Sequence, residues 1–122
     1  STADLSANIY VKATIGATAV TANTPIYVYL ARSDNAGTIV SEDGNGTADA
    51  AGTFVNTPLL GVINIAATTT NAQYTGVFST EGLGALGPSW GIGLVFNGGA
   101  GSLHATAGSH AVEYVGITKS IA

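Results

Sequence analysis

The 122-residue chain contains no cysteine and few charged side chains. Without cysteine it forms no disulfide and offers no thiolate to a metal ion, and because small secreted domains are often held by disulfides, the absence favours folding in the cytosol. Only Lys12, Arg32 and Lys119 are basic, and the net charge is −4. So little positive charge leaves no basic patch for phosphates, and we expect neither direct nucleic-acid binding nor attachment to an anionic membrane.

Charged residues make up 8% of the sequence, whereas about a quarter is typical of soluble domains. The hydrophobic fraction of 46% is ordinary, so alanine, threonine and glycine stand where charges usually would. Interface cores are depleted in charge, and small side chains lose little conformational entropy when another protein covers them. The composition therefore favours a chain that packs against copies of itself or against neighbours.

Long apolar runs are also missing, and no segment has the roughly 20 apolar residues that a membrane-spanning helix needs. Apolar residues instead alternate with polar ones, which is the period of a β-strand. Segments 9–15 and 26–30 each place one apolar face toward a core. These faces are formed by Ile9, Val11, Ala13, Ile15, Ile26, Val28 and Leu30.

The remainder of the chain continues this pattern. Residues 59–65 read as a buried strand, with 72–78 as its hairpin partner, and 90–96 alternate again. Residues 103–107 and 111–117 are expected to form a closing hairpin around a turn at Gly108. This spacing predicts an all-β fold, a single β-sandwich or jelly roll of about seven to eight short antiparallel strands.

The prediction covers residues 1–122 as one domain with two irregular parts. Residues 1–8 precede the first predicted strand and would form an N-terminal arm. Residues 32–53 form a long acidic loop that includes a short strand over 38–40. A connection of this length is usually functional or mobile.

Residues 87–91 read G-x-S-x-G, the form of a nucleophile elbow. An elbow needs a strand before Ser89 and a helix after it, whereas here an irregular stretch precedes Ser89 and a β pattern follows. Both histidines come before Glu113, the one acid after Ser89, which is the wrong order for an α/β-hydrolase. We therefore expect Ser89 to start a strand, Trp90 to anchor it, and the chain to have no catalytic residues and no enzyme activity.

Two other groups of residues match metal sites in part. Residues 43–49 alternate oxygen-bearing side chains like a calcium loop, but Phe54 stands where the final carboxylate belongs. His104 and His110 would face each other across the closing hairpin, yet Glu113 would point to the opposite face. We expect no metal and no cofactor.

Large side chains remain as candidates for contacts. Tyr27 and Tyr29 share a strand face, and such a pair either stacks on a sugar or packs across strands. The residues predicted to anchor an interface or the packing are Trp90, Tyr27, Tyr29, Leu5, Leu83 and Leu86.

Four short motifs occur between residues 60 and 116: LGVI at 60–63, LGPSWGI at 86–92, NGGAGSL at 97–103 and YVG at 114–116. In these the chain resembles small virion proteins of tailed bacteriophages. The resemblance implies a capsid decoration (cement) protein that binds the major capsid protein and copies of itself, as a trimer or another homo-oligomer. It implies a place on the exterior of a virion assembled in the host cytoplasm.

Two alternatives stay open. The first alternative to a decoration protein is a tail, neck or fibre component of such a particle. The second is a carbohydrate-binding or adhesive β-sandwich. The second alternative would use Tyr27, Tyr29 and Trp90.

Overall fold

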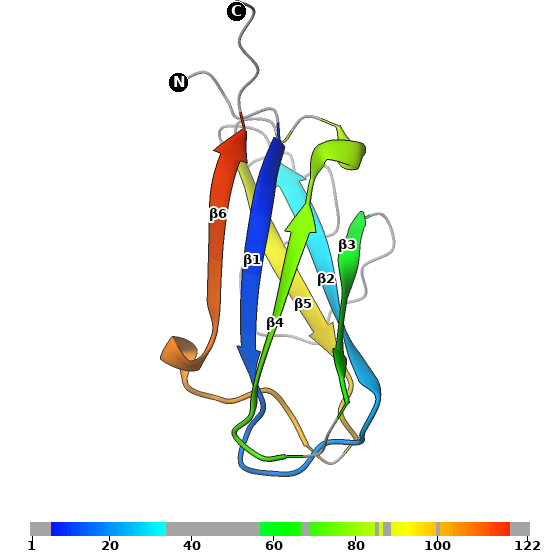
Figure 1. The fold of residues 1–122 in the computed structure, drawn as a ribbon, viewed down its shortest axis with the longest axis vertical. Helices are drawn as coiled ribbons and strands as arrows, with labels where there is room; N and C mark the ends of the chain where they lie inside the picture. Colours follow the sequence, from blue (N-terminus) through cyan, green and yellow to red (C-terminus); the bar gives the residue numbers. More distant parts are fainter. Residues whose placement is uncertain are drawn as a thin grey trace, which may run out of the picture.

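The computed structural model describes residues 6–33, 57–66, 69–84, 86, 89–99 and 101–117. These residues form six strands and two short 3-10 helices, which are β1 (Ser6–Thr14), β2 (Thr24–Ser33), β3 (Leu59–Ile65), β4 (Gln73–Ser79), η1 (Glu81–Leu83), β5 (Ser89–Phe96), η2 (Ala107–Ser109) and β6 (Ala111–Ile117). The strands make two three-stranded antiparallel sheets, in the orders β4-β1-β6 and β3-β2-β5. The sheets pack face to face (Figure 1), so the predicted all-β fold is confirmed.

The core lies between the two central strands, β1 and β2. Every apolar residue that the sequence assigns to their inner faces is buried, and most of them are fully inaccessible to solvent. Burying one such aliphatic side chain contributes roughly 1.5–3 kcal/mol, so these two strands supply much of the driving force for folding. Apolar and polar residues alternate strictly in β1 and β2 because both strands are central. The opposite sheet covers their inner faces along the whole length of each strand.

The predicted hairpin of β3 and β4 is wrong. β4 pairs with β1, where Phe78 lies opposite Ile9, and β3 pairs with β2 in the other sheet. The chain therefore crosses from one sheet to the other between these two strands. β3 is also buried on one face only, since Ile63 and Ile65 are buried whereas Val62 is exposed.

The sheets approach each other most closely along β3 and β4, and glycine makes this approach possible. The ring of Phe78 fills the space between the strands. A Cβ atom on Gly61 would lie 2.5 Å from that ring, and one on Gly76 would lie 2.7 Å from it. This side of the sandwich is closed by one aromatic side chain that packs against two bare backbones.

The predicted closing hairpin is also wrong. β6 pairs with β1, and Leu103 makes a single bridge to Ile15 instead of opening a strand beside β6. Residues between Leu103 and β6 form a loop that contains η2. Hydrogen bonds to β1 hold this loop in place and replace the expected strand pairing.

The irregular parts fall largely outside the described residues. β1 begins at Ser6, so residues 6–8 of the predicted arm belong to the sheet, while residues 1–5 are outside the described part. β2 extends through Arg32 and Ser33, so the predicted loop starts later than expected. The rest of that loop, with its predicted strand and calcium-like motif, is not among the described residues.

Candidate interaction surface

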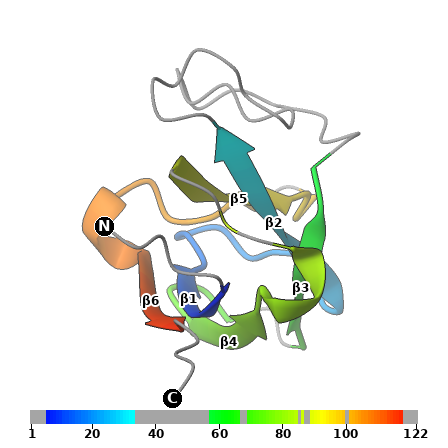
Figure 2. The same cartoon turned by 90° about the horizontal axis from the view of Figure 1, so that it is seen from above.

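The side of the sandwich formed by β5 and β6 is open. In Figure 2, β6 and the start of β5 lie at one side of the two layers, and β3 lies at the other. Val112 and Tyr114 on β6 stand opposite the buried residues Val11 and Ile9 of β1, so their side chains point toward the interior. They are nevertheless 47% and 55% exposed. Side chains of the core thus reach solvent along this side.

We call this surface the open seam. It is a shallow groove lined by Ser89, Trp90, Gly91, Ile92, Val112 and Tyr114. Trp90 and Ile92 come from β5, and their inner sides pack against the core. No residue in the lining is charged, so the groove offers apolar area, aromatic ring edges and the hydroxyl groups of Ser89 and Tyr114.

Trp90 and Tyr114 bridge the seam. Their ring centroids are 4.9 Å apart and their planes meet at 79°, an edge-to-face arrangement. Such a pair contributes about 0.5–1.5 kcal/mol beyond the area that it buries. Trp90 is therefore a packing residue, as predicted for a strand anchor, and at the same time part of an accessible surface.

Charge is distributed in an unusual way over the strands. Lys12 and Arg32 lie on the central strands, whereas the four outer strands contain a single charged residue, Glu113, and no proline. Glu113 stands opposite Tyr10 on the outer face, away from the seam. Sheet edges that stay in solvent are usually protected by lysine, other charges or proline. The described part of this chain protects its outer strands with almost none of these.

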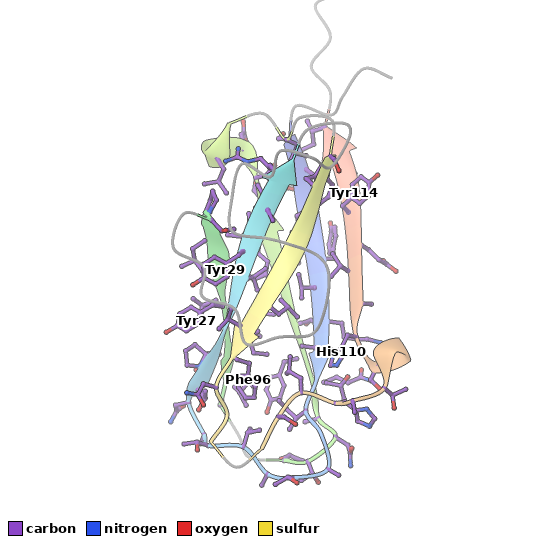
Figure 3. All side chains as sticks on the ribbon, turned by 180° about the vertical axis from the view of Figure 1, so that it is seen from behind. Tyr27, Tyr29, Phe96, His110 and Tyr114 are labelled. Atoms are coloured by element: carbon purple, nitrogen blue, oxygen red, sulfur yellow. The ribbon has the colours of Figure 1, made fainter. Side chains whose placement is uncertain are left out.

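A second apolar surface lies on the outer face of β2. Tyr27 and Tyr29 share this face, as predicted, and both are labelled in Figure 3. Tyr27 lies between Val62 of β3 and Val95 of β5 and is exposed. This tyrosine face is thus continuous across all three strands of the sheet.

The remaining predicted anchors have other positions. Leu86 is 1% exposed, so it packs in the core and offers no surface. Leu83 is half-buried against the core, and its carbonyl oxygen accepts a hydrogen bond of 2.8 Å from Nη1 of Arg32. Leu5 lies outside the described residues.

The two histidines lie in one loop, where hydrogen bonds orient their rings. Nδ1 of His110 accepts the backbone N–H of Thr14 at 3.2 Å, and its Nε2 donates to the carbonyl oxygen of His104 at 2.8 Å. Nδ1 of His104 accepts the backbone N–H of Thr106. Among the residues that the structure describes, no group of three histidine, cysteine or acidic side chains lies close enough to hold a metal ion.

Ser89 has no catalytic partner among these groups. It starts β5, and the strand continues to Phe96 where an elbow requires a helix. β5 begins at the upper end of the sandwich in Figure 1, while His110 lies near the lower end in Figure 3. The G-x-S-x-G match therefore marks the start of a strand.

Comparisons with protein-family models, curated protein sequences and solved structures found no match to the chain. None of the helices in the described ranges is long and apolar enough to cross a membrane. Within the described residues, the open seam and the tyrosine face are the features that point to a function. The tyrosine face was predicted from sequence, but the exposure of Val112 and Tyr114 was not, because alternation places both residues inside.

Proposed function

We propose that this chain is a structural virion protein that decorates the exterior of a capsid, where it binds the major capsid protein and stabilises the shell. The observation that carries the proposal is the near absence of charge on the four outer strands. Such strands are a liability for a protein that stays free in solution. They suit a protein that neighbours cover on several sides.

The exposed apolar side chains face in opposite directions. Tyr27 and Val62 lie on the outer face of one sheet, and Tyr10 and Val77 lie on the outer face of the other. A sandwich with two such faces can contact two neighbouring shell subunits at once. When one rigid body ties two subunits, separating them requires several contacts to break together, and this is how a decoration protein resists internal pressure without any chemistry.

The sequence motifs supply the link to a virion. The LGPSWGI and NGGAGSL motifs, which resemble those of tailed-phage virion proteins, contain the start of β5 and the turn after it. Ser89, Trp90, Gly91 and Ile92 of the LGPSWGI motif line the open seam. The resemblance supports a virion as the binding partner. The near absence of charge on the four outer strands supports a role in binding.

A carbohydrate-binding module is the second candidate, and the tyrosine face favours it. Tyr27 and Tyr29 lie side by side on an open sheet surface, and Gly93 stands next to Tyr29 without a side chain. A flat aromatic platform of this kind can stack on a sugar ring. A glycan array separates the candidates, because a decoration protein needs no glycan.

Sedimentation with empty shells from the source phage tests the proposal. The purified chain is expected to saturate the shells at a simple ratio to the shell protein. Tyr27→Glu, which places a charge on the tyrosine face, should weaken binding by about tenfold or more. Ala17→Glu, in an exposed loop away from both faces, should bind like the wild type. A chain that stays in the supernatant at all concentrations contradicts the proposal.

A further inference from the structure

We infer that two copies of this chain join through their open seams, side against side, and form a two-fold symmetric dimer with one continuous core. The inference does not depend on the role in a virion. It rests on the geometry and composition of the β5/β6 side and on its contrast with the β3/β4 side.

The seam is a core that has been left open. Val112 and Tyr114 point inward yet are about half exposed, and Trp90 and Ile92 are only partly buried on the facing strand. Interfaces of obligate homodimers have this character and resemble a domain core cut in half. The surface that best covers an open core is another open core of the same depth and composition.

The closed side shows that the openness is specific to one side. Along β3 and β4 the sheets come together, with Phe78 between two glycines. Along β5 and β6 no glycine pair draws the strands together, and the aromatic pair of Trp90 and Tyr114 spans the space instead. The sandwich is thus closely packed along β3 and β4, whereas inward-pointing side chains reach solvent along β5 and β6.

The chemistry of the seam accepts a second copy without a charge penalty. Its lining contains no charged residue, and Glu113 points to the outer face. Within the described part of the chain, each of β5 and β6 pairs with one neighbour only. A two-fold axis would set β6 beside β6 and β5 beside β5 in antiparallel pairs, the arrangement of every other pair in this fold.

Within the described residues, the unpaired edges of β5 and β6, one in each sheet, also decide the occupant. A single extended peptide could add to β5 or to β6, but it could not continue both sheets. A second copy related by a two-fold axis presents the same two edges and can therefore continue both sheets. Strands of seven and eight residues at about 3.3 Å per residue, across a side about 20 Å thick, give about 500 Å² per partner, or about 1,000 Å² in total. This meets the lower limit of about 1,000 Å² for a specific interface.

Sedimentation equilibrium of the full chain, from low micromolar to submillimolar concentration, tests the dimer. The wild type should approach twice the monomer mass of 12.0 kDa. Val112→Glu, which places a carboxylate in the seam of both copies, should weaken association by at least about 100-fold. Val77→Glu is the matched control, since Val77 is an exposed valine on the opposite edge of the same sheet and should leave association unchanged.

Measurements on the wild type alone keep the test decisive if Val112→Glu fails to fold. Trp90 is the only tryptophan, so its emission should shift to shorter wavelength as concentration rises. Amide hydrogen exchange should slow along β5 and β6 with concentration, and stay constant along β3 and β4. A 12.0 kDa species at every concentration, exchange that slows along β3 and β4 instead, or equal weakening by both variants would each overturn the inference.

Discussion

The indole of Trp90 on β5 meets the phenol ring of Tyr114 on β6 edge to face, with 4.9 Å between the ring centroids. This contact joins the two sheets on the side where they are otherwise open, and it places the only tryptophan of the chain beside a surface residue. The fluorescence of Trp90 therefore reports on the seam.

Tyr114→Ala should destabilise the fold by about 1 kcal/mol, because it removes the aromatic pair and part of the cover of Trp90. The tryptophan emission at low micromolar concentration should shift to longer wavelength. Tyr10→Ala is the control, since Tyr10 is a similarly exposed tyrosine on the outer face of the same sheet. If both variants shift the emission equally, the seam is not organised by this pair.

Gly61→Ala should destabilise the fold by about 1–3 kcal/mol, because the new methyl group would overlap the ring of Phe78 in a packed position. Gly91→Ala provides the comparison within a strand, since a Cβ atom there meets no atom within 4 Å. Its stability should change by less than about 0.5 kcal/mol. Chemical denaturation measures both, and an equal loss in the two variants would argue against the tight approach of β3 and β4.

The sequence predicts which residues of the central strands are buried, but it does not predict how the strands pair. Strict alternation identifies β1 and β2 and assigns Ile9 and Val28 to the core, because both strands are covered along their whole inner faces. Alternation says nothing about which strand pairs with which. The partner of β4 is β1 and not the adjacent β3, against which Phe78 of β4 packs across the two sheets at Gly61.

The candidate site was predicted only in part for a related reason. The shared face of Tyr27 and Tyr29 follows directly from their spacing along one strand. The open seam depends on how the two sheets diverge along β5 and β6, and the pattern around Val112 and Tyr114 is the same whether a facing strand covers them or not. Exposure of an inward-pointing residue is a property of the assembled sandwich.

Thr80→Val should cost about 1–3 kcal/mol, because it leaves a buried backbone donor without its acceptor. Thr80 is fully buried, its hydroxyl accepts the N–H of Ala7 at 2.9 Å, and its own N–H donates to the carbonyl oxygen of Ala7 at 3.0 Å. Thr75→Val makes the same chemical change at an exposed position of β4 and should be nearly neutral. Thermal unfolding followed by circular dichroism measures the difference, and equal effects would contradict a buried hydrogen bond at Thr80.

His110→Ala should release the loop before β6 from β1. A backbone amide only donates and a carbonyl only accepts, so the bonds to Thr14 and His104 require a neutral His110 ring with its proton on Nε2. Without the ring, the amide of Thr14 should exchange with solvent at least about tenfold faster. His104→Ala should leave this amide protected, because the ring of His104 is hydrogen-bonded within the loop. Unchanged exchange at Thr14 in His110→Ala would show that the loop is held by other contacts.

The measurement that tests the central claim most directly is the copy number of this chain in washed, sedimented particles from its source lysate. Quantitative mass spectrometry would compare it with the most abundant shell protein. Decoration predicts one copy per shell subunit or a simple fraction of that number. A few copies per particle would instead indicate a tail, neck or fibre component, and recovery only in the soluble fraction would contradict a virion role altogether.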